Sequence, residues 1–294
     1  MIPSIYTYAM SAAVAQSLKD YTLVNLAFLH VESDGSLRYN SDPIRPGSDP
    51  GMAEGNLDLA GSGKYIFLSI GGPGCDDDYL NIAANYDSFL YDLKKLLRSY
   101  FILGIDLALE PTSHPYSDFL PVCTQLVTDL SEAGYWVSAS PCAEMNFWQS
   151  LLDNTRFPDD GSVRFFVYNL PLYRGVSYPA WVDGFTGLVP DPEYFLTAGF
   201  DGHLSHPGEV ARALFDLTET YPRLFFASIW RNGNLVEAYE PAQYAEAIMA
   251  AGFQPGADVR TAAAAHVQAY RENLARHYTI PIAGATIGSP AGTA

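Results

Sequence analysis

Short runs of β-branched and aromatic residues alternate with amphipathic segments along nearly all of this chain, and this alternation constrains the fold more than any other feature. Strands that alternate with helices pair in parallel through right-handed crossovers, which place the helices outside the sheet. The eight strand-like runs are Ile2–Tyr8, Thr22–Val31, Lys64–Gly72, Ile102–Glu110, Tyr135–Cys142, Arg164–Leu170, Arg223–Trp230 and Thr279–Ile287. The helix-like segments between them include Tyr86–Ser99, Tyr116–Ala133, Pro207–Thr220, Pro241–Ala251 and Arg260–His277. Eight such units predict an α/β fold of the (β/α)8 TIM-barrel type.

Glycine and proline mark the C-terminal ends of most strand-like runs, as in Gly71-Gly72-Pro73. In a barrel these ends share one face, and their loops carry the functional site. The stretch from Pro171 to Ser205 is rich in aromatic residues and has no clear period, so we interpret it as a long insertion after the sixth strand, lying over the mouth. No Ser/Gly-rich or charged linker divides the chain, which predicts a single barrel domain over residues 1–294.

The charge and the cysteines exclude several function classes. The 294 residues include 33 acidic and 16 basic side chains, for a net charge of −17. Such a chain repels nucleic-acid phosphates and anionic lipid, so neither nucleic acid nor a membrane is an expected partner. Cys75, Cys123 and Cys142 are too widely spaced for a disulfide framework or a zinc motif, so we expect free thiols, no metal site and no cofactor.

The first residues, MIPSIYTYAM, have no basic stretch followed by a long apolar run, so they do not resemble a signal peptide. We therefore expect a cytoplasmic or other intracellular location for the chain as written. A secreted location is the alternative if a leader has been removed.

The fourth strand-like run, GIDLALE, places Asp106, Ala108 and Glu110 on one face, because alternate residues of a strand share a face. The apolar residues between them belong on the outer face, against the helices. Two carboxylates therefore point into the barrel, with Glu110 at the C-terminal rim. An inward carboxylate is costly to bury unless it accepts hydrogen bonds. The alternative is a structural role, with Asp106 held by neighbouring hydroxyls and Glu110 solvated.

Four consecutive strand-like runs carry short motifs in a fixed order. The motifs are Ser69-Ile70-Gly71-Gly72, then Gly104, Asp106 and Glu110, then Val137-Ser138-Ala139-Ser140-Pro141, and finally Phe166-Val167-Tyr168-Asn169. They are similar to the SxGG, DGxDxDxE, apolar-Ser-x-Ala-Pro and QFYN strands of one enzyme family. The chain thus resembles family 18 glycoside hydrolases, the chitinase family, whose fold is a (β/α)8 barrel.

The resemblance implies a mechanism and also a defect in it. In this family the acetamido oxygen of the substrate attacks the anomeric carbon, and one carboxylic acid protonates the leaving oxygen. By resemblance Glu110 is this acid, and its surroundings must raise its pKa. The residue two before it is normally an aspartate that grips the acetamido group, but here it is Ala108. The first aspartate of the motif is also missing, with Leu103 in its place.

Other family positions carry over to this sequence unevenly. Ser69 and one of Tyr6 or Tyr8 match hydroxyls that hydrogen-bond the inner aspartate, here Asp106. Tyr168 and Asn169 match the residues that hold the acetamido group, and Gly71 belongs to the SxGG motif beside them. The family's eighth strand ends in a tryptophan that forms the floor of the sugar site. Trp230 fills this role only if its strand is the eighth, whereas the segments after it indicate the seventh.

Three functions follow as hypotheses. The leading one is a chitinase-like barrel with lost or strongly reduced hydrolysis, which binds N-acetylglucosamine-containing oligosaccharides or serves for storage. The chain is also similar in plan to the narbonin-like seed proteins, which carry this barrel without known chitinase activity. The second hypothesis is an active chitinase or endo-β-N-acetylglucosaminidase with Glu110 as general acid. The third is a protein-binding module of the inhibitor type. The sequence leaves the oligomeric state open.

Overall fold

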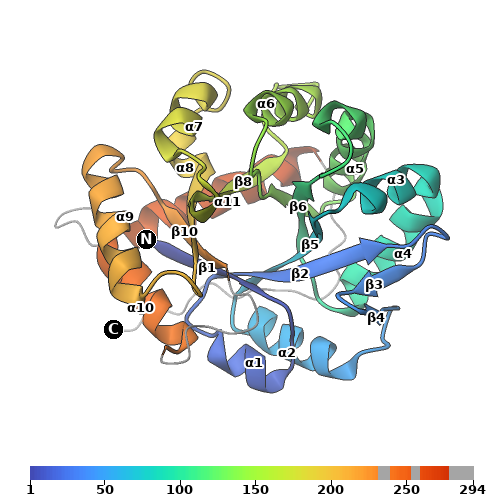
Figure 1. Ribbon diagram of the computed structural model, residues 1–294, viewed down its shortest axis with the longest axis horizontal. Coiled ribbons are helices and arrows are strands. Elements are labelled where there is room, and N and C mark those ends of the chain that lie inside the picture. Colours follow the sequence, from blue (N-terminus) through green and yellow to red (C-terminus); the bar gives the residue numbers. More distant parts are fainter. Residues whose placement is uncertain (231–238, 253–258, 278–294) are drawn as a thin grey trace.

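Eight parallel strands close into a barrel in this computed structural model, which describes residues 1–230, 239–252 and 259–277 (Figure 1). Neighbouring strands follow one another around the barrel, and pairing of the first with both the second and the last closes it. The barrel strands are β1 (Ile2–Thr7), β2 (Leu23–Val31), β5 (Tyr65–Pro73), β6 (Gly104–Glu110), β7 (Trp136–Ala139), β8 (Phe165–Pro171), β9 (Leu196–Asp201) and β10 (Phe226–Trp230). Two short strands, β3 (Leu37–Tyr39) and β4 (Asp42–Pro43), extend the sheet antiparallel outside the barrel. The predicted TIM barrel is confirmed.

Helices lie between the strands and surround the barrel (Figure 1). The described helices are α1 (Ala12–Ser17), α2 (Pro50–Gly61), α3 (Asp76–Ala84), α4 (Tyr86–Ser99), η1 (Tyr116–Phe119), α5 (Leu120–Glu132), α6 (Met145–Asn154), η2 (Leu172–Arg174), α7 (Tyr178–Phe185), α8 (Pro192–Phe195), α9 (Pro207–Thr220), α10 (Pro241–Ala251) and α11 (Val259–His277). Proline begins α2, α9 and α10, where its fixed φ suits the first turn. In the described part of the chain, no helix has both the length and the apolar character needed to cross a bilayer.

The seventh and eighth strands differ from the sequence-based assignment. The segment after the sixth strand, interpreted as an insertion, contains α7, α8 and also β9, which is the seventh barrel strand. β10 is therefore the eighth strand, and assigning its residues to the seventh was wrong. The run Thr279–Ile287, predicted as the eighth strand, lies outside the described residues.

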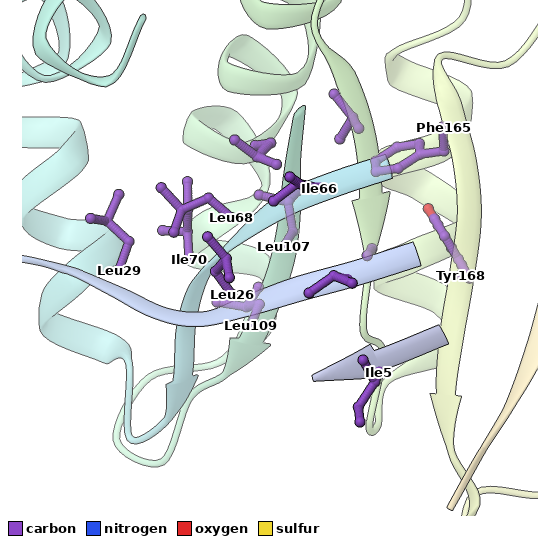
Figure 2. Packing of buried hydrophobic residues seen from close by; sticks show 14 of the residues in the cluster. Ile5, Leu26, Leu29, Ile66, Leu68, Ile70, Leu107, Leu109, Phe165 and Tyr168 are labelled. Carbon is purple, nitrogen blue, oxygen red and sulfur yellow. The ribbon is translucent and has the colours of Figure 1, made fainter. Parts of the chain in front are cut away.

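The outer faces of the barrel strands pack against the helices (Figure 2). Ile5, Leu26, Leu68 and Leu107 are at most 1% exposed and belong to one large apolar cluster that includes helix residues such as Leu93. Burying a side chain of this size contributes roughly 1.5–3 kcal/mol. The alternation predicted for the fourth strand follows from this packing, because the outward apolar residues leave Asp106 and Ala108 on the inner face.

Aromatic rings close the N-terminal end of the barrel. Trp136 lies 4.9 Å from both Phe166 and Tyr270 between ring centroids, and Phe166 lies 5.2 Å from Tyr270. Tyr270, from α11, also donates a hydrogen bond of 2.6 Å to the backbone oxygen of Arg164. These rings fill the N-terminal end of the barrel, so a site for a ligand must lie toward the C-terminal ends of the strands.

We predict that Gly104→Ala strongly destabilises the protein. A Cβ at this position on β6 would collide with the backbone of Trp136 on β7, which cannot move without breaking the sheet. Overpacking typically costs ~1–3 kcal/mol, and a clash against backbone should reach the upper end of that range. Chemical denaturation measures the free energy of unfolding. The matched control is Gly61→Ala at the end of α2, where nothing lies within 4 Å of the new Cβ and no loss is expected. An equal stability of the two variants would contradict the strand packing.

Candidate functional site

Asp106 is the centre of a buried polar network inside the barrel. Its side chain is fully buried, and one carboxylate oxygen accepts hydrogen bonds from Tyr6 (3.2 Å), Ser69 (2.9 Å) and Ser140 (2.9 Å). The other oxygen accepts from Ser138 (2.8 Å) and Asn169 (3.3 Å). These donors come from β1, β5, β8 and β7 with the residue just after its end. The carboxylate on β6 therefore links five of the eight barrel strands.

Burial and hydrogen bonding act on Asp106 in opposite directions. Removal from water raises its pKa, while the hydroxyls of Ser138, Ser69, Ser140 and Tyr6 stabilise the carboxylate and lower the pKa; burial prevails. The same burial raises the pKa of Tyr6 well above its ordinary value, so this phenol remains a donor. The contact of Tyr6 with Ser140 measures 2.5 Å and joins the network to the barrel mouth.

Glu110 stands at the end of β6 and forms an ion pair. Its Oε2 lies 2.6 Å from Nη1 of Arg174, a residue of η2 just beyond β8. The Glu110 side chain is 13% exposed and that of Arg174 is 41% exposed. Burial raises the pKa of Glu110, and the guanidinium of Arg174 opposes this increase. The proposed acid is therefore partly desolvated, as the family mechanism requires, but a cation contacts its carboxylate.

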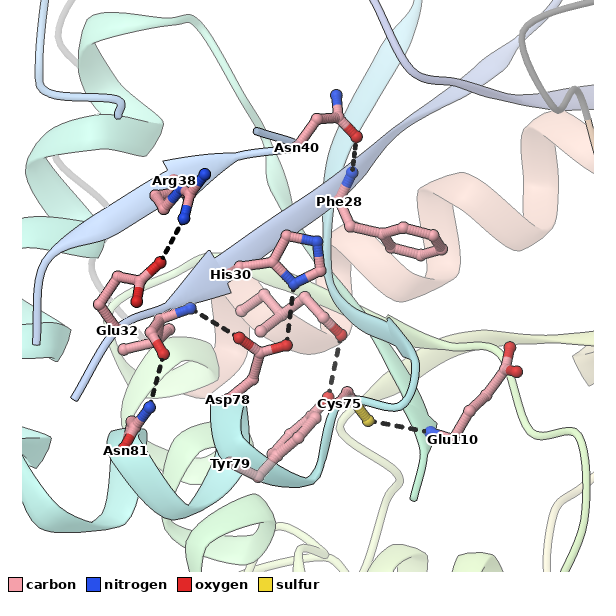
Figure 3. A network of polar contacts seen from close by, with 12 residues as sticks. Phe28, His30, Glu32, Arg38, Asn40, Cys75, Asp78, Tyr79, Asn81 and Glu110 are labelled. Carbon is pink, nitrogen blue, oxygen red and sulfur yellow. Dashed lines mark hydrogen bonds and ion pairs between the residues drawn. The ribbon is translucent and has the colours of Figure 1, made fainter. Parts of the chain in front are cut away.

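The start of α3 holds the loop that follows Glu110. Asp76 accepts hydrogen bonds from the backbone N–H groups of Thr112 (2.7 Å), Ser113 (2.8 Å) and His114 (2.9 Å). The Sγ atom of Cys75 accepts the N–H of Glu110 at 3.1 Å (Figure 3). Burial raises the pKa of this thiol to about 12. These contacts fix the backbone on both sides of Glu110.

Ala108 lies in a small apolar cluster at the mouth. The residue is 2% exposed and packs with Tyr6, Ala27 and Phe28, while the half-buried Tyr8 and Trp230 lie against the same group. The Trp230 ring centroid lies 4.8 Å from Tyr6, 5.3 Å from Phe28 and 6.1 Å from Tyr8. A carboxylate at position 108 would thus face aromatic rings and a methyl group.

Little space remains at this mouth. The cavity there measures about 20 Å³, enough for about one water molecule. Its walls are Tyr6, Ala108, Glu110, Ser140, Asn169, Pro171, Tyr173, Gly199, Ser228 and Trp230. Ligand pockets commonly measure about 300–1,000 Å³, so a sugar ring can enter only if a wall moves.

A larger hollow, of about 510 Å³, lies beside the mouth. It is lined by His30, Glu32, Asp77, Asp78 and other residues of β2 and α3. Asp78 contacts the His30 ring at 2.9 Å and accepts the N–H of Val31 at 2.7 Å (Figure 3). The hollow contains none of the site residues predicted from the sequence.

The structure brings most predicted residues together. Asp106, Ser69 and Asn169 lie in the network, and Tyr6, not Tyr8, supplies the phenol to Asp106. Tyr8 lies on the rim. Trp230 ends the eighth strand, which is the position expected for the family's tryptophan.

Two predicted residues lie elsewhere. Tyr168 is fully buried on the outer side of β8, packs against Phe185 and Phe195, and donates to the backbone oxygen of Trp148 at 3.2 Å. Consecutive strand residues face opposite sides, so Tyr168 and Asn169 cannot both point inward. At Gly71 a Cβ would lie 2.6 Å from the backbone oxygen of Ala108, so this glycine permits the close approach of β5 and β6.

Sequence reasoning did not assign Ser138, Ser140 or Arg174 to the site. The two serines were visible as the Ser-x-Ser pattern of the fifth strand, whose inward face also follows from the alternation. Tyr173, one of the aromatic residues in the stretch from Pro171 to Ser205, forms a wall of the cavity. No motif marks Arg174, because its contact with Glu110 depends on how η2 folds back over the mouth.

Several solved structures with a similar fold are named as family 18 glycoside hydrolases. A GH18 chitinase from Pseudoalteromonas aurantia superposes with a TM-score of 0.64 at 16% identity, covering 85% of this chain and 100% of that one. A fungal endo-β-N-acetylglucosaminidase of the same family gives 0.61 at 13%, covering 87% and 99%. The Bacillus cereus spore cortex-lytic enzyme SleL gives 0.60 at 10%, covering 86% and 74%. No protein-family model matches the sequence, and no curated protein matches it significantly. The chain therefore has a chitinase-like barrel fold.

We predict that Asp76 stabilises the protein above about pH 4 and ceases to do so toward pH 2. Desolvation raises the pKa of Asp76, but the hydrogen bonds from the N–H groups of Thr112, Ser113 and His114 outweigh this effect and lower the pKa to about 2. In the unfolded chain the pKa of an aspartate is about 3.9. A depressed pKa means that the stabilisation is lost as pH falls through this window. Thermal unfolding of wild type and Asp76→Asn from pH 6 to pH 2 should show a gap in Tm that narrows below pH 4. A gap independent of pH would contradict the assignment.

We also predict that Arg174→Met raises the pKa of Glu110, because it removes the cation that lowers it. Carbon-13 NMR titration of the Glu110 carboxyl group measures this pKa directly. Arg156→Met, which removes an ion pair with Asp153 on α6, is the control and should leave Glu110 unchanged. An unaltered Glu110 pKa in Arg174→Met would show that the ion pair is absent in solution.

Proposed function

We propose that this chain is a chitinase-like barrel that does not hydrolyse glycans and instead binds N-acetylglucosamine-containing oligosaccharides at its mouth. One observation carries the proposed lack of hydrolysis. Ala108 replaces the aspartate that binds the acetamido group in the family, and it is buried among Tyr6, Ala27 and Phe28. A methyl group neither accepts the acetamido N–H nor stabilises the positive charge of the intermediate. Loss of one such preorganised contact typically costs ~10²–10³ in rate.

The ion pair supports the same conclusion. Proton donation to a leaving oxygen requires a protonated and accessible Glu110, but its Oε2 lies 2.6 Å from the guanidinium of Arg174. The guanidinium favours the ionised form and so offsets part of the increase in the Glu110 pKa that burial causes. Glu110 therefore lacks the partner aspartate, and its carboxyl group is held by Arg174 instead of being free to contact a leaving oxygen.

The aromatic rings support retained binding. Trp230 and Tyr8 are half-buried at the rim, and their faces suit the apolar C–H surfaces of sugar rings. Because the cavity holds only about 20 Å³, a sugar that enters must displace a wall, and Tyr173 on the short turn η2 is the wall residue we expect to move. A shift of η2 would also break the contact of the adjacent Arg174 with Glu110. Affinity is then reduced by the free energy of breaking the Arg174–Glu110 pair.

Calorimetric titration with chitotetraose tests the proposal. We expect weak, saturable binding to wild type, at least about tenfold weaker binding to Trp230→Ala, a loss of ~1.4 kcal/mol or more, and tighter binding to Arg174→Met because no ion pair must break. Tyr91→Ala on α4, which removes an aromatic side chain that is 61% exposed, is the control and should bind as wild type does.

Absence of heat at millimolar chitotetraose, in wild type and in Arg174→Met alike, would refute the binding half. The storage and protein-binding hypotheses would then take its place. Unchanged affinity in Trp230→Ala would place any binding away from the mouth.

A further inference from the structure

Each of the eight barrel strands contributes one buried polar residue to the barrel interior. In strand order around the chain they are Ser4, Asn25, Ser69, Asp106, Ser138, Asn169, Thr197 and Ser228, all at most 3% exposed. We call this set the polar belt. Barrel interiors are usually filled by layers of bulky branched side chains, whereas this layer consists mostly of small hydroxyl and amide groups.

One side of the polar belt is satisfied within the protein. Ser69, Ser138 and Asn169 donate to Asp106, and the Oδ1 of Asn169 accepts the hydroxyl of Thr197 at 3.0 Å. Asp106 receives five donors in all when Tyr6 and Ser140 are included. It has little capacity left for any further donor.

The other side of the belt, on β1 and β2, is not satisfied by the protein. The Oγ of Ser4 and both Oδ1 and Nδ2 of Asn25 are buried without a hydrogen-bond partner. Ser4 pairs with Leu23 in register, which places Asn25 two residues further on the neighbouring strand and on the same inner face. A buried amide without partners is destabilising, and native proteins seldom leave such groups unpaired.

We propose that the barrel interior binds at least one ordered water molecule between Ser4 and Asn25. The chemistry of the amide selects this ligand, because one of its atoms needs a donor and the other needs an acceptor. Water supplies both, whereas a metal cation would satisfy Oδ1 and leave the Nδ2 donor unpaired. The requirement is unchanged if the amide is flipped.

Ser228 connects the unsatisfied half of the polar belt with the mouth. Ser228 is the register partner of Ser4 on β10 and also lines the cavity of about 20 Å³ at the mouth. Polar side chains thus continue from the mouth to the unsatisfied half of the belt. Buried waters typically make about three hydrogen bonds to such groups.

The direct test is a high-resolution crystal structure of the wild-type protein. We expect density for a water within hydrogen-bond distance of the Asn25 amide and the Ser4 hydroxyl. A dry interior, or an Asn25 amide bonded to other side chains, would overturn the proposal.

Thermal unfolding of Asn25→Leu provides an independent test, because the two alternatives change Tm in opposite directions. If water satisfies the amide, the leucine leaves that water short of partners, and Tm falls. If the amide is dry, an apolar residue of similar size relieves an unpaired polar group, and Tm rises, which would contradict the site. If Asn25→Leu does not fold, the Tm of Ser4→Ala and the wild-type crystal structure still test the proposed water site.

A double-substitution cycle separates one shared water from unrelated effects. If Ser4 and Asn25 hold the same water, the combined variant should lose less stability than the sum of the single changes. Additive losses would overturn the shared site. Ser69→Ala, whose hydroxyl already donates to Asp106, serves as the reference for removing a satisfied belt hydroxyl and should be additive with Ser4→Ala.

Discussion

The buried carboxylate of Asp106 is the constraint on which the centre of this barrel depends. A charge without access to water must be compensated, and here five donors from several strands surround it. Removing Asp106 would leave buried hydroxyls and an amide without their acceptor. The motif residues around Asp106 therefore stabilise the barrel, whether or not the site is catalytic. Their survival in a sequence is therefore not by itself a sign of catalysis.

Two residues at the mouth, Ala108 and Arg174, are free of that constraint. Ala108 makes no polar contact with the network and packs with Phe28 and Tyr6 instead. Arg174 contacts Glu110 from η2, a short turn that the barrel does not need for closure. Substitutions at these two positions leave every hydrogen bond to Asp106 in place. This separation explains how a chain can keep most of a catalytic strand and still, as we propose, lack the reaction.

The sequence predicted much of this architecture because alternating apolar runs report burial on both sides of a parallel sheet. The first six strands and five of the longest helices were located this way. β9 was missed because LTAGFD is short, contains glycine and alanine, and follows an aromatic segment without period. That omission shifted the numbering of the next strand and left the position of Trp230 open. Tyr168 was assigned by motif alone, although alternation already excluded an inward position for both Tyr168 and Asn169. The Arg174–Glu110 pair depends on tertiary folding that no local pattern encodes.

Hydrolysis by the wild-type protein is the most direct test of the account. Chitotetraose incubated with the purified chain for several days, and analysed by mass spectrometry, should remain intact, as in a sample without protein. Shorter oligosaccharides that appear with wild type and disappear with Glu110→Gln would contradict the account, because Glu110 would then act as a general acid despite Ala108 and Arg174.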